Sequence, residues 1–277
     1  MSPPADIRLL LSDVDGTLVT RDKLLTPRAI AAAQALHRAG VAFAVTSARP
    51  PRGLAMLVEP LGITEPLAGF NGGVLTNPDL SVIETHAIDP AAARKTVEMF
   101  KRHGADVWVY DADTWFVHDP KAPHVEREAW ILKFGPEVVS DFADAQLDTA
   151  IKIVGVSEDP AVMAACEKDA PGALGDAVSA TRSASYFLDV TNPKATKGCV
   201  VDTLAGRLGL RPSQIATIGD MPNDVLMFRR SGFSIAMGNA ADDVKAQASA
   251  VTDSNEDDGF AKAVERFLLP AKTGAPA

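Results

Sequence analysis

The chain has 277 residues, of which 47% are hydrophobic and 23% are charged, a balance typical of a globular protein that buries a core. It carries 27 basic and 36 acidic side chains. The resulting net charge of −9 argues against an extended surface for nucleic acid or for an anionic membrane, so we expect neither partner.

Apolar runs of strand length alternate with helical segments in the first part of the chain. The runs over 7–11, 41–45 and 66–70 are too short for buried helices and do not alternate, which is typical of strands covered on both faces. Helices are expected between them, the first bounded by Thr26 at its N-cap and Gly40 past its end. This β-α-β-α-β order predicts a parallel sheet with right-handed crossovers.

The pattern changes in the middle of the chain. Its strands and helices mix in an order typical of antiparallel pairing, which indicates an α+β module. The expected strands are 107–110, 114–118, 151–156, 177–182 and 186–190, and the expected helices are 89–103, 123–134 and 160–168. We therefore expect an inserted α+β cap domain over 80–188, within a core domain made of 1–79 and 189–277. We expect the aromatic rings of Trp108, Trp115 and Trp130 in the core of the insert.

The first pattern returns in the last third of the chain. The expected elements are a helix over 196–208, strands over 215–218 and 233–236, an edge strand at 251–252, a closing helix over 259–268 and a frayed tail over 270–277. The fold class is therefore α/β, with a parallel-sheet core interrupted by the insert.

Two observations concern the compartment. The start of the chain has no basic region, and no apolar stretch is long enough to span a bilayer, so we expect a cytoplasmic protein. Cys166 and Cys199 are far apart and lack metal-like spacing, which favours two buried thiols in a reducing compartment. The sequence does not indicate an oligomeric state.

Polar clusters follow four of the apolar runs. They are Asp13 with Asp15, Ser47 with Arg49, Asn71, and Asp220 with Asn223 and Asp224. Because the carboxyl ends of parallel strands lie at one edge of the sheet, these clusters should converge. Carboxylates at this density repel one another unless a cation is present, and oxygen ligands that leave positions open for phosphate suit Mg²⁺. Calcium is the alternative metal, although Gly16 comes too early for an EF-hand loop.

An anionic substrate would also need a positive charge from the protein. Lys197 begins a helix where the chain re-enters the sheet domain, which makes it the first candidate. The alternatives are that Lys197 is a solvated surface lysine, or that Arg49 is the cation. The Asp13–Thr17 stretch has its own simpler interpretation, a solvated turn after a strand.

Four motifs, in this order, resemble those of the haloacid dehalogenase superfamily phosphatases. The matching residues are Asp13-Val14-Asp15-Gly16-Thr17, Ser47, Lys197-Gly198, and Gly219-Asp220 with Asn223-Asp224. The insert and the preceding Asn71-Gly72-Gly73 are similar to the Cof-type subfamily with a type IIB (C2B) cap. Ser47-Ala48-Arg49 stands where that subfamily usually has Thr-Gly-Arg, and serine keeps the hydroxyl group.

The resemblance implies a Rossmann-like core and a Mg²⁺-dependent phosphatase acting on a small phosphorylated metabolite, a sugar phosphate or a cofactor phosphate. Asp13 would form an aspartyl-phosphate, Asp15 would be the general acid and base, and Lys197 would neutralise charge. The implied metal ligands are Asp13, the Asp15 backbone carbonyl and Asp220, with Asn223 or Asp224 in the inner or outer shell. The implied substrate-binding residues are Ser47, Ala48, Arg49, Asn71, Gly72 and Lys197.

Two other classes of function share these features. A phosphomutase would use the same chemistry but return the phosphoryl group, so release of inorganic phosphate separates the two. A non-catalytic protein that binds phosphorylated metabolites would keep the fold and lose the acid–base pair, and the presence of Asp15 argues against it.

Overall fold

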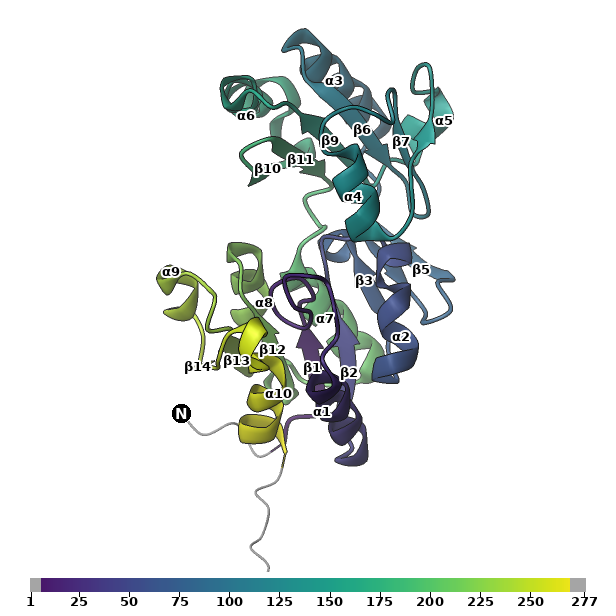
Figure 1. Ribbon diagram of the computed structural model, residues 1–277. Helices are drawn as coiled ribbons and strands as arrows, with labels where there is room; N and C mark the ends of the chain where they lie inside the picture. Colours follow the sequence, from purple (N-terminus) through teal and green to yellow (C-terminus); the bar gives the residue numbers. More distant parts are fainter. Residues whose placement is uncertain (1–5, 270–277) are drawn as a thin grey trace, which may run out of the picture.

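The computed structural model describes residues 6–269, which fold into a core domain and a cap domain joined by two connections (Figure 1). Within these residues the core domain contains a five-stranded sheet in the order β14-β13-β12-β1-β2, and every neighbouring pair is parallel. Its strands are β1 (Leu9–Ser12), β2 (Ala42–Val45), β12 (Ile215–Gly219), β13 (Phe233–Ala236) and β14 (Ala250–Val251). The predicted parallel, Rossmann-like sheet is confirmed.

Helices cover both faces of this sheet because successive strand residues point to opposite sides. Leu10 of β1 belongs to the apolar cluster under α1 (Pro27–Arg38), α2 (Ala55–Leu61) and α10 (Gly259–Ala263). Its neighbours Leu9 and Leu11 belong to the cluster on the other face, which is covered by the remaining core helices. These are α7 (Lys197–Leu208), α8 (Val225–Phe228) and α9 (Asp242–Lys245). All of β1 is buried, as the uninterrupted apolar run predicts.

The third apolar run departs from the expected parallel sheet. β3 (Leu67–Gly69) meets the main sheet through a single parallel bridge between Thr46 and Ala68. It pairs antiparallel with β4 (Val74–Thr76), which pairs antiparallel with β5 (Val82–Thr85), and neither of these strands was predicted. The cause is a tight turn after β3, where Phe70 and Asn71 both adopt left-handed backbone angles and reverse the chain.

The cap domain has a mixed sheet with helices on both sides. Within the described residues its order is β10-β11-β9-β6-β7-β8, antiparallel except for β7 with β8. The strands are β6 (Asp106–Tyr110), β7 (Trp115–Val117), β8 (Glu137–Val138), β9 (Lys152–Val156), β10 (Ser179–Ala184) and β11 (Phe187–Thr191). Helices α3 (Pro90–Arg102), α5 (Asp144–Asp148) and α6 (Pro160–Leu174) pack on the outer face.

Helix α4 (Val125–Leu132) lies on the opposite face of the cap sheet, the face toward the core domain (Figure 1). Its cluster contains Trp108 and Trp115 together with Phe70 of the core domain. Trp130 is 50% exposed, so the expectation that all three tryptophans are in the cap core is wrong for this one. It lies on the solvent side of α4, where Lys133 covers its ring at 4.5 Å.

The strand pairings bear on the expected domain limits. β5 pairs with β4, outside the cap sheet, whereas β11, which contains residue 188, pairs with β9 inside it. We therefore propose that the two connections run near residues 86–89 and 192–195. They lie side by side, because Asn192 Nδ2 donates a hydrogen bond of 2.7 Å to the Ala87 carbonyl.

Three further expectations can be compared with the structure. Cys166 and Cys199 are both free thiols, Cys166 buried and Cys199 partly exposed. No helix within residues 6–269 combines the length and hydropathy needed to cross a bilayer, and the cytoplasmic location stays a prediction. The tail over 270–277 lies outside the described residues.

Candidate active site

Strand β1 delivers Asp13 to the carboxyl edge of the sheet. The Asp13 backbone N–H continues the ladder by donating to the Ile218 carbonyl at 2.9 Å, and its side chain is 4% exposed. The chain then turns at Gly16, whose φ is +81°. A Cβ at Gly16 would collide with the Asp220 carboxylate, so both the backbone angle and the space require glycine.

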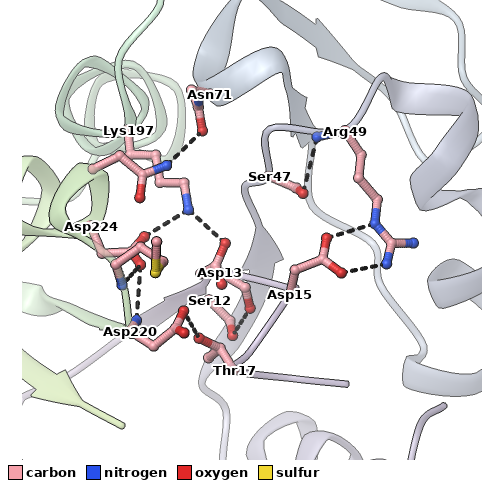
Figure 2. Close-up of polar contacts among 12 residues, drawn as sticks. Ser12, Asp13, Asp15, Thr17, Ser47, Arg49, Asn71, Lys197, Asp220 and Asp224 are labelled. Carbon is pink, nitrogen blue, oxygen red and sulfur yellow. Dashed lines mark hydrogen bonds and ion pairs between the residues drawn. The ribbon is translucent and has the colours of Figure 1, made fainter. Parts of the chain in front are cut away.

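Lys197 lies between two of the predicted carboxylates (Figure 2). As the first residue of α7 it is 2% exposed, and its Nζ lies 2.5 Å from Asp13 Oδ1 and 2.7 Å from Asp224 Oδ1. Burial acts to lower the pKa of this lysine, but the two carboxylates outweigh it and the pKa is raised. Lys197 is therefore charged at neutral pH, and the interpretation as a solvated surface lysine is wrong.

The loop after β12 is shaped by Asp224. This side chain is fully buried, and its Oδ2 accepts hydrogen bonds of 2.9 Å from the backbone N–H groups of Asp220 and Met221. Asp220 in turn accepts from Thr17 Oγ1 at 3.4 Å and from Asn239 Nδ2 at 3.0 Å. The carboxylates of both residues are held at the edge of the sheet beside Asp13.

These three carboxylates form a site that fits a divalent cation. Asp13, Asp220 and Asp224 each offer an oxygen, and the three oxygens lie within 4.8 Å of one another. Asp13 Oδ2 is buried and has no hydrogen-bond partner within residues 6–269. Burial, with repulsion from Asp224, raises the pKa of Asp13 to about 7 and that of Asp220 to about 6. A hard cation with oxygen ligands would relieve this repulsion.

Asp15 points away from this trio (Figure 2). Arg49 donates to both of its oxygens, from Nε at 2.7 Å and from Nη2 at 2.6 Å, and Lys23 Nζ lies 2.7 Å from Oδ1. Burial acts to raise the pKa of Asp15, but these two cations outweigh it and hold the pKa below its usual value. Arg49 therefore holds the Asp15 carboxylate in place.

Of the other predicted substrate-binding residues, Ser47 and Asn71 lie near Asp13 (Figure 2). Asn71 N donates to the Ser47 carbonyl at 2.7 Å, and Asn71 Oδ1 accepts from Asn223 Nδ2 at 3.2 Å. Ala48 is exposed. Gly72, with a φ of +100°, packs against Val200 of α7. The structure therefore brings Ser47 and Asn71 to the site, whereas Gly72 supports the packing of α7.

Three residues of the site were missed by the sequence reasoning. Asn239 follows β13, so the rule that polar residues after strand ends converge could have found it. Thr17 belongs to the first motif but was given no role. Lys23 lies in a polar link with no distinguishing pattern, and only the fold shows that it reaches Asp15.

Comparisons with known proteins agree with this geometry. Residues 10–264 match the family model described as haloacid dehalogenase-like hydrolase. The chain belongs to this family. The membership confirms the predicted family and, with it, the prediction of an enzyme of the phosphatase type.

Relatives match this hydrolase over almost the whole chain. One 5-amino-6-(5-phospho-D-ribitylamino)uracil phosphatase of Bacillus subtilis is 24% identical over 265 residues, which are 95% of this chain and 97% of the relative. A haloacid dehalogenase-like hydrolase from Bacteroides thetaiotaomicron has 25% identity and a TM-score of 0.87, covering 94% of this chain and 99% of its own. A subclass IIB sugar phosphatase of the superfamily shares the fold, with 24% identity, a TM-score of 0.79 and coverage of 92% and 97%.

Proposed function

We propose that this hydrolase is a Mg²⁺-dependent phosphatase that cleaves the phosphomonoester of a small phosphorylated metabolite through an aspartyl-phosphate. The observation that carries the proposal is the placement of two carboxylates. Asp13 is buried beside Lys197 and the carboxylates of Asp220 and Asp224, while the side chain of Asp15, two residues on, is held by Arg49. Relatives that act on a phosphorylated ribitylaminouracil and on sugar phosphates support the substrate class.

Asp13 is the nucleophile in this mechanism. One of its oxygens attacks phosphorus, an O–P bond forms to Asp13, and the bond from phosphorus to the leaving oxygen breaks. The ammonium group of Lys197, 2.5 Å from Asp13 Oδ1, favours the ionised carboxylate against the effect of burial and neutralises part of the phosphate charge. The Ser47 hydroxyl and the backbone N–H groups near Val14–Gly16 provide donors for the phosphate oxygens.

Asp15 is the proton donor and acceptor of this mechanism. It donates a proton to the leaving oxygen in the first step and takes one from the attacking water in the second, which releases inorganic phosphate and restores Asp13. The bidentate contact with Arg49 and the ion pair with Lys23 fix the orientation of this carboxylate. The low pKa that these cations impose favours the ionised form, which is the base needed in the second step.

The cation would be held by Asp13, Asp220 and the Asp15 backbone carbonyl, with Asp224 or Asn223 close by. When bound, it supplies positive charge that offsets the repulsion between the attacking carboxylate and the phosphate dianion. Mg²⁺ suits a site with few carboxylates and open positions.

The test of the proposed function is a phosphate-release assay over a panel of phosphorylated metabolites and p-nitrophenyl phosphate with Mg²⁺. Asp13→Asn should lower the turnover number at least about 10³-fold, because an amide oxygen is a poor nucleophile. Asp22→Asn, at an exposed position of the link after the first motif, is the matched control and should keep full activity. Near-normal turnover by a folded Asp13→Asn protein would contradict the covalent mechanism, and transfer without phosphate release would indicate a mutase.

The metal dependence needs a separate experiment. Removal of metal with EDTA should abolish phosphate release, and Mg²⁺ should restore it better than Ca²⁺, whose looser and larger coordination shell suits in-line transfer poorly. Full activity in a sample shown by elemental analysis to be metal-free would rule out this part of the proposal.

A further inference from the structure

A second group of charged side chains lies in the cap, on the sheet face toward the core domain. Lys152 of β9 stands directly opposite Tyr110 of β6 and Thr191 of β11. Asp189 lies two residues before Thr191 and therefore shares this face. Lys152 Nζ is 2.8 Å from Asp189 Oδ2, with side chains only 14% and 15% exposed. We call Tyr110, Glu128, Lys152 and Asp189 the cap cluster.

The cap cluster adjoins the catalytic groups. The Tyr110 ring is buried, and its centre lies 5.7 Å from the centre of the Phe70 ring. Phe70 is the residue immediately before Asn71 in the chain. Its hydroxyl interacts with the carboxylate of Glu128, a half-buried residue of α4. Glu128 is also within electrostatic reach of Arg49 and Asp15. The cap cluster therefore lies on the side of the cap that faces Arg49 and Asp15.

Helix α4 packs against the core domain at this point. A Cβ on Gly53 would lie 3.6 Å from Leu132 at the end of α4, and the Arg52 guanidinium lies 4.5 Å from the centre of the Phe134 ring. Glu128 is one turn before Leu132 on the same helix. The cap cluster is thus held at the domain interface, next to the place where a leaving group attached to the phosphate must extend.

The cluster has unused capacity to accept hydrogen bonds. Asp189 Oδ1 is buried and has no hydrogen-bond partner within residues 6–269. A buried carboxylate oxygen without a donor is costly, as is a nearly buried ion pair, unless further hydrogen bonds satisfy it. Two carboxyl groups, Glu128 and Asp189, share one ammonium group, so the cluster has acceptor oxygens that its own donors leave unsatisfied.

From these contacts we infer that Asp189 and Glu128 are the leaving-group subsite, and that they accept hydrogen bonds from a leaving group rich in donors, either hydroxyl or ammonium. Lys152 is the positioning residue that holds Asp189 in place. The inference rests on the proposed function and narrows its substrate class. An apolar leaving group would leave the acceptors unpaired, and a carboxylated one would be repelled.

The test compares kcat/KM for sorbitol 6-phosphate and hexyl phosphate, which match in chain length and differ in hydroxyl groups. The wild-type enzyme should prefer sorbitol 6-phosphate, and Asp189→Asn and Glu128→Gln should each reduce that preference about 10- to 100-fold, the effect of losing one charged acceptor. Asp169→Asn is the matched control. It removes an ion-paired cap carboxylate that contacts His103 at 3.1 Å on the far side of the cap, and should leave the preference unchanged.

A second comparison identifies the donor. Preference for glucosamine 6-phosphate over glucose 6-phosphate, lost in both variants, would assign an ammonium group, whereas equal rates would assign the hydroxyl groups.

Glu128→Gln decides the question if Asp189→Asn does not fold by circular dichroism. Two outcomes would overturn this inference and leave the proposed function standing. In the first, the variants slow both esters equally; in the second, the wild-type enzyme hydrolyses p-nitrophenyl phosphate but does not distinguish the sorbitol ester from the hexyl ester. Absence of phosphate release from every ester would overturn the proposed function as well.

Discussion

Single residues at the carboxyl edge of the sheet combine a function with a cost in stability. Asp220 is 8% exposed, and burial with repulsion from Asp224 raises its pKa to about 6 from an ordinary value of 3.8. In the metal-free protein the folded state therefore binds the proton more tightly than the unfolded state. The free energy of unfolding should fall as the pH rises from near 4 through the folded-state pKa of about 6.

The matching prediction concerns Asp220→Asn, which removes the charge and nearly preserves the shape. The unfavourable contribution of wild-type Asp220 is on the order of 3 kcal/mol once the carboxylate is fully ionised. The metal-free variant should therefore melt above the wild type at about pH 8 and close to it at about pH 4.5. Added Mg²⁺ should raise the melting temperature of the wild type more than that of the variant. Calorimetry measures both, with exposed Asp176→Asn as control. Identical pH profiles for variant and wild type would contradict this account.

At the scale of the elements, the turns after the strands decide where side chains of the site lie. Gly16 and Gly40 both adopt left-handed backbone angles, with φ of +81° and +73°. A methyl group at Gly40, past the end of α1, would meet nothing within 4 Å, whereas at Gly16 it would meet the Asp220 carboxylate. Comparing alanine variants at the two glycines therefore distinguishes the free-energy cost of the backbone angle from the effect of displacing the Asp220 carboxylate.

Gly16→Ala and Gly40→Ala should each lower the free energy of unfolding by roughly 1–2 kcal/mol, the cost of the left-handed conformation for an L-residue. Only Gly16→Ala should also weaken Mg²⁺ binding and phosphate release, each by at least about tenfold, because the new methyl group displaces a carboxylate of the metal site. Urea unfolding, metal titration and the phosphate assay give the three readouts. Equal losses of activity in both variants would show that the contact with Asp220 is unimportant.

At the scale of the whole molecule, the two domains divide the site between them. The core domain contains the three carboxylates of Asp13, Asp220 and Asp224, together with Lys197 and with Asp15 and its cationic partners. Its two main apolar clusters contain core-domain residues only. The cap contributes α4 and the cap cluster, and it shares the apolar cluster that contains Phe70 and Val74. Chemistry should therefore belong to the core domain and selectivity to the cap.

A capless enzyme tests this division. Because Asn192 contacts Ala87, a short Gly/Ser linker can join His86 to Asn192 without distorting the core sheet. The shortened enzyme should keep some hydrolysis of p-nitrophenyl phosphate and lose most of its discrimination among phosphorylated metabolites, since closure and contacts to the leaving group are gone. The measurement is kcat/KM over one panel for both proteins, after circular dichroism confirms folding. An unchanged rank order and spread would show that the cap does not determine specificity.

The sequence by itself determined the parallel core sheet, the inserted α+β module and the four polar clusters after strand ends. These follow from local rules: uninterrupted apolar runs form buried strands, and parallel strands bring their carboxyl ends to one edge. Asp13, Lys197, Asp220 and Asp224 meet for this reason, although they come from distant parts of the chain.

Only the tertiary structure decided which partner each of these side chains takes. The contact between Lys23 and Asp15 and the contact between Lys152 and Asp189 could not be predicted from the local sequence. In both pairs, the spacing between the two residues follows no periodic pattern of a helix or strand. The antiparallel segment formed by β4 and β5 was missed because the turn before it places two residues other than glycine, Phe70 and Asn71, in the left-handed conformation. Asparagine adopts this conformation more readily than most residues, but it is uncommon for phenylalanine, so the local pattern does not mark the reversal.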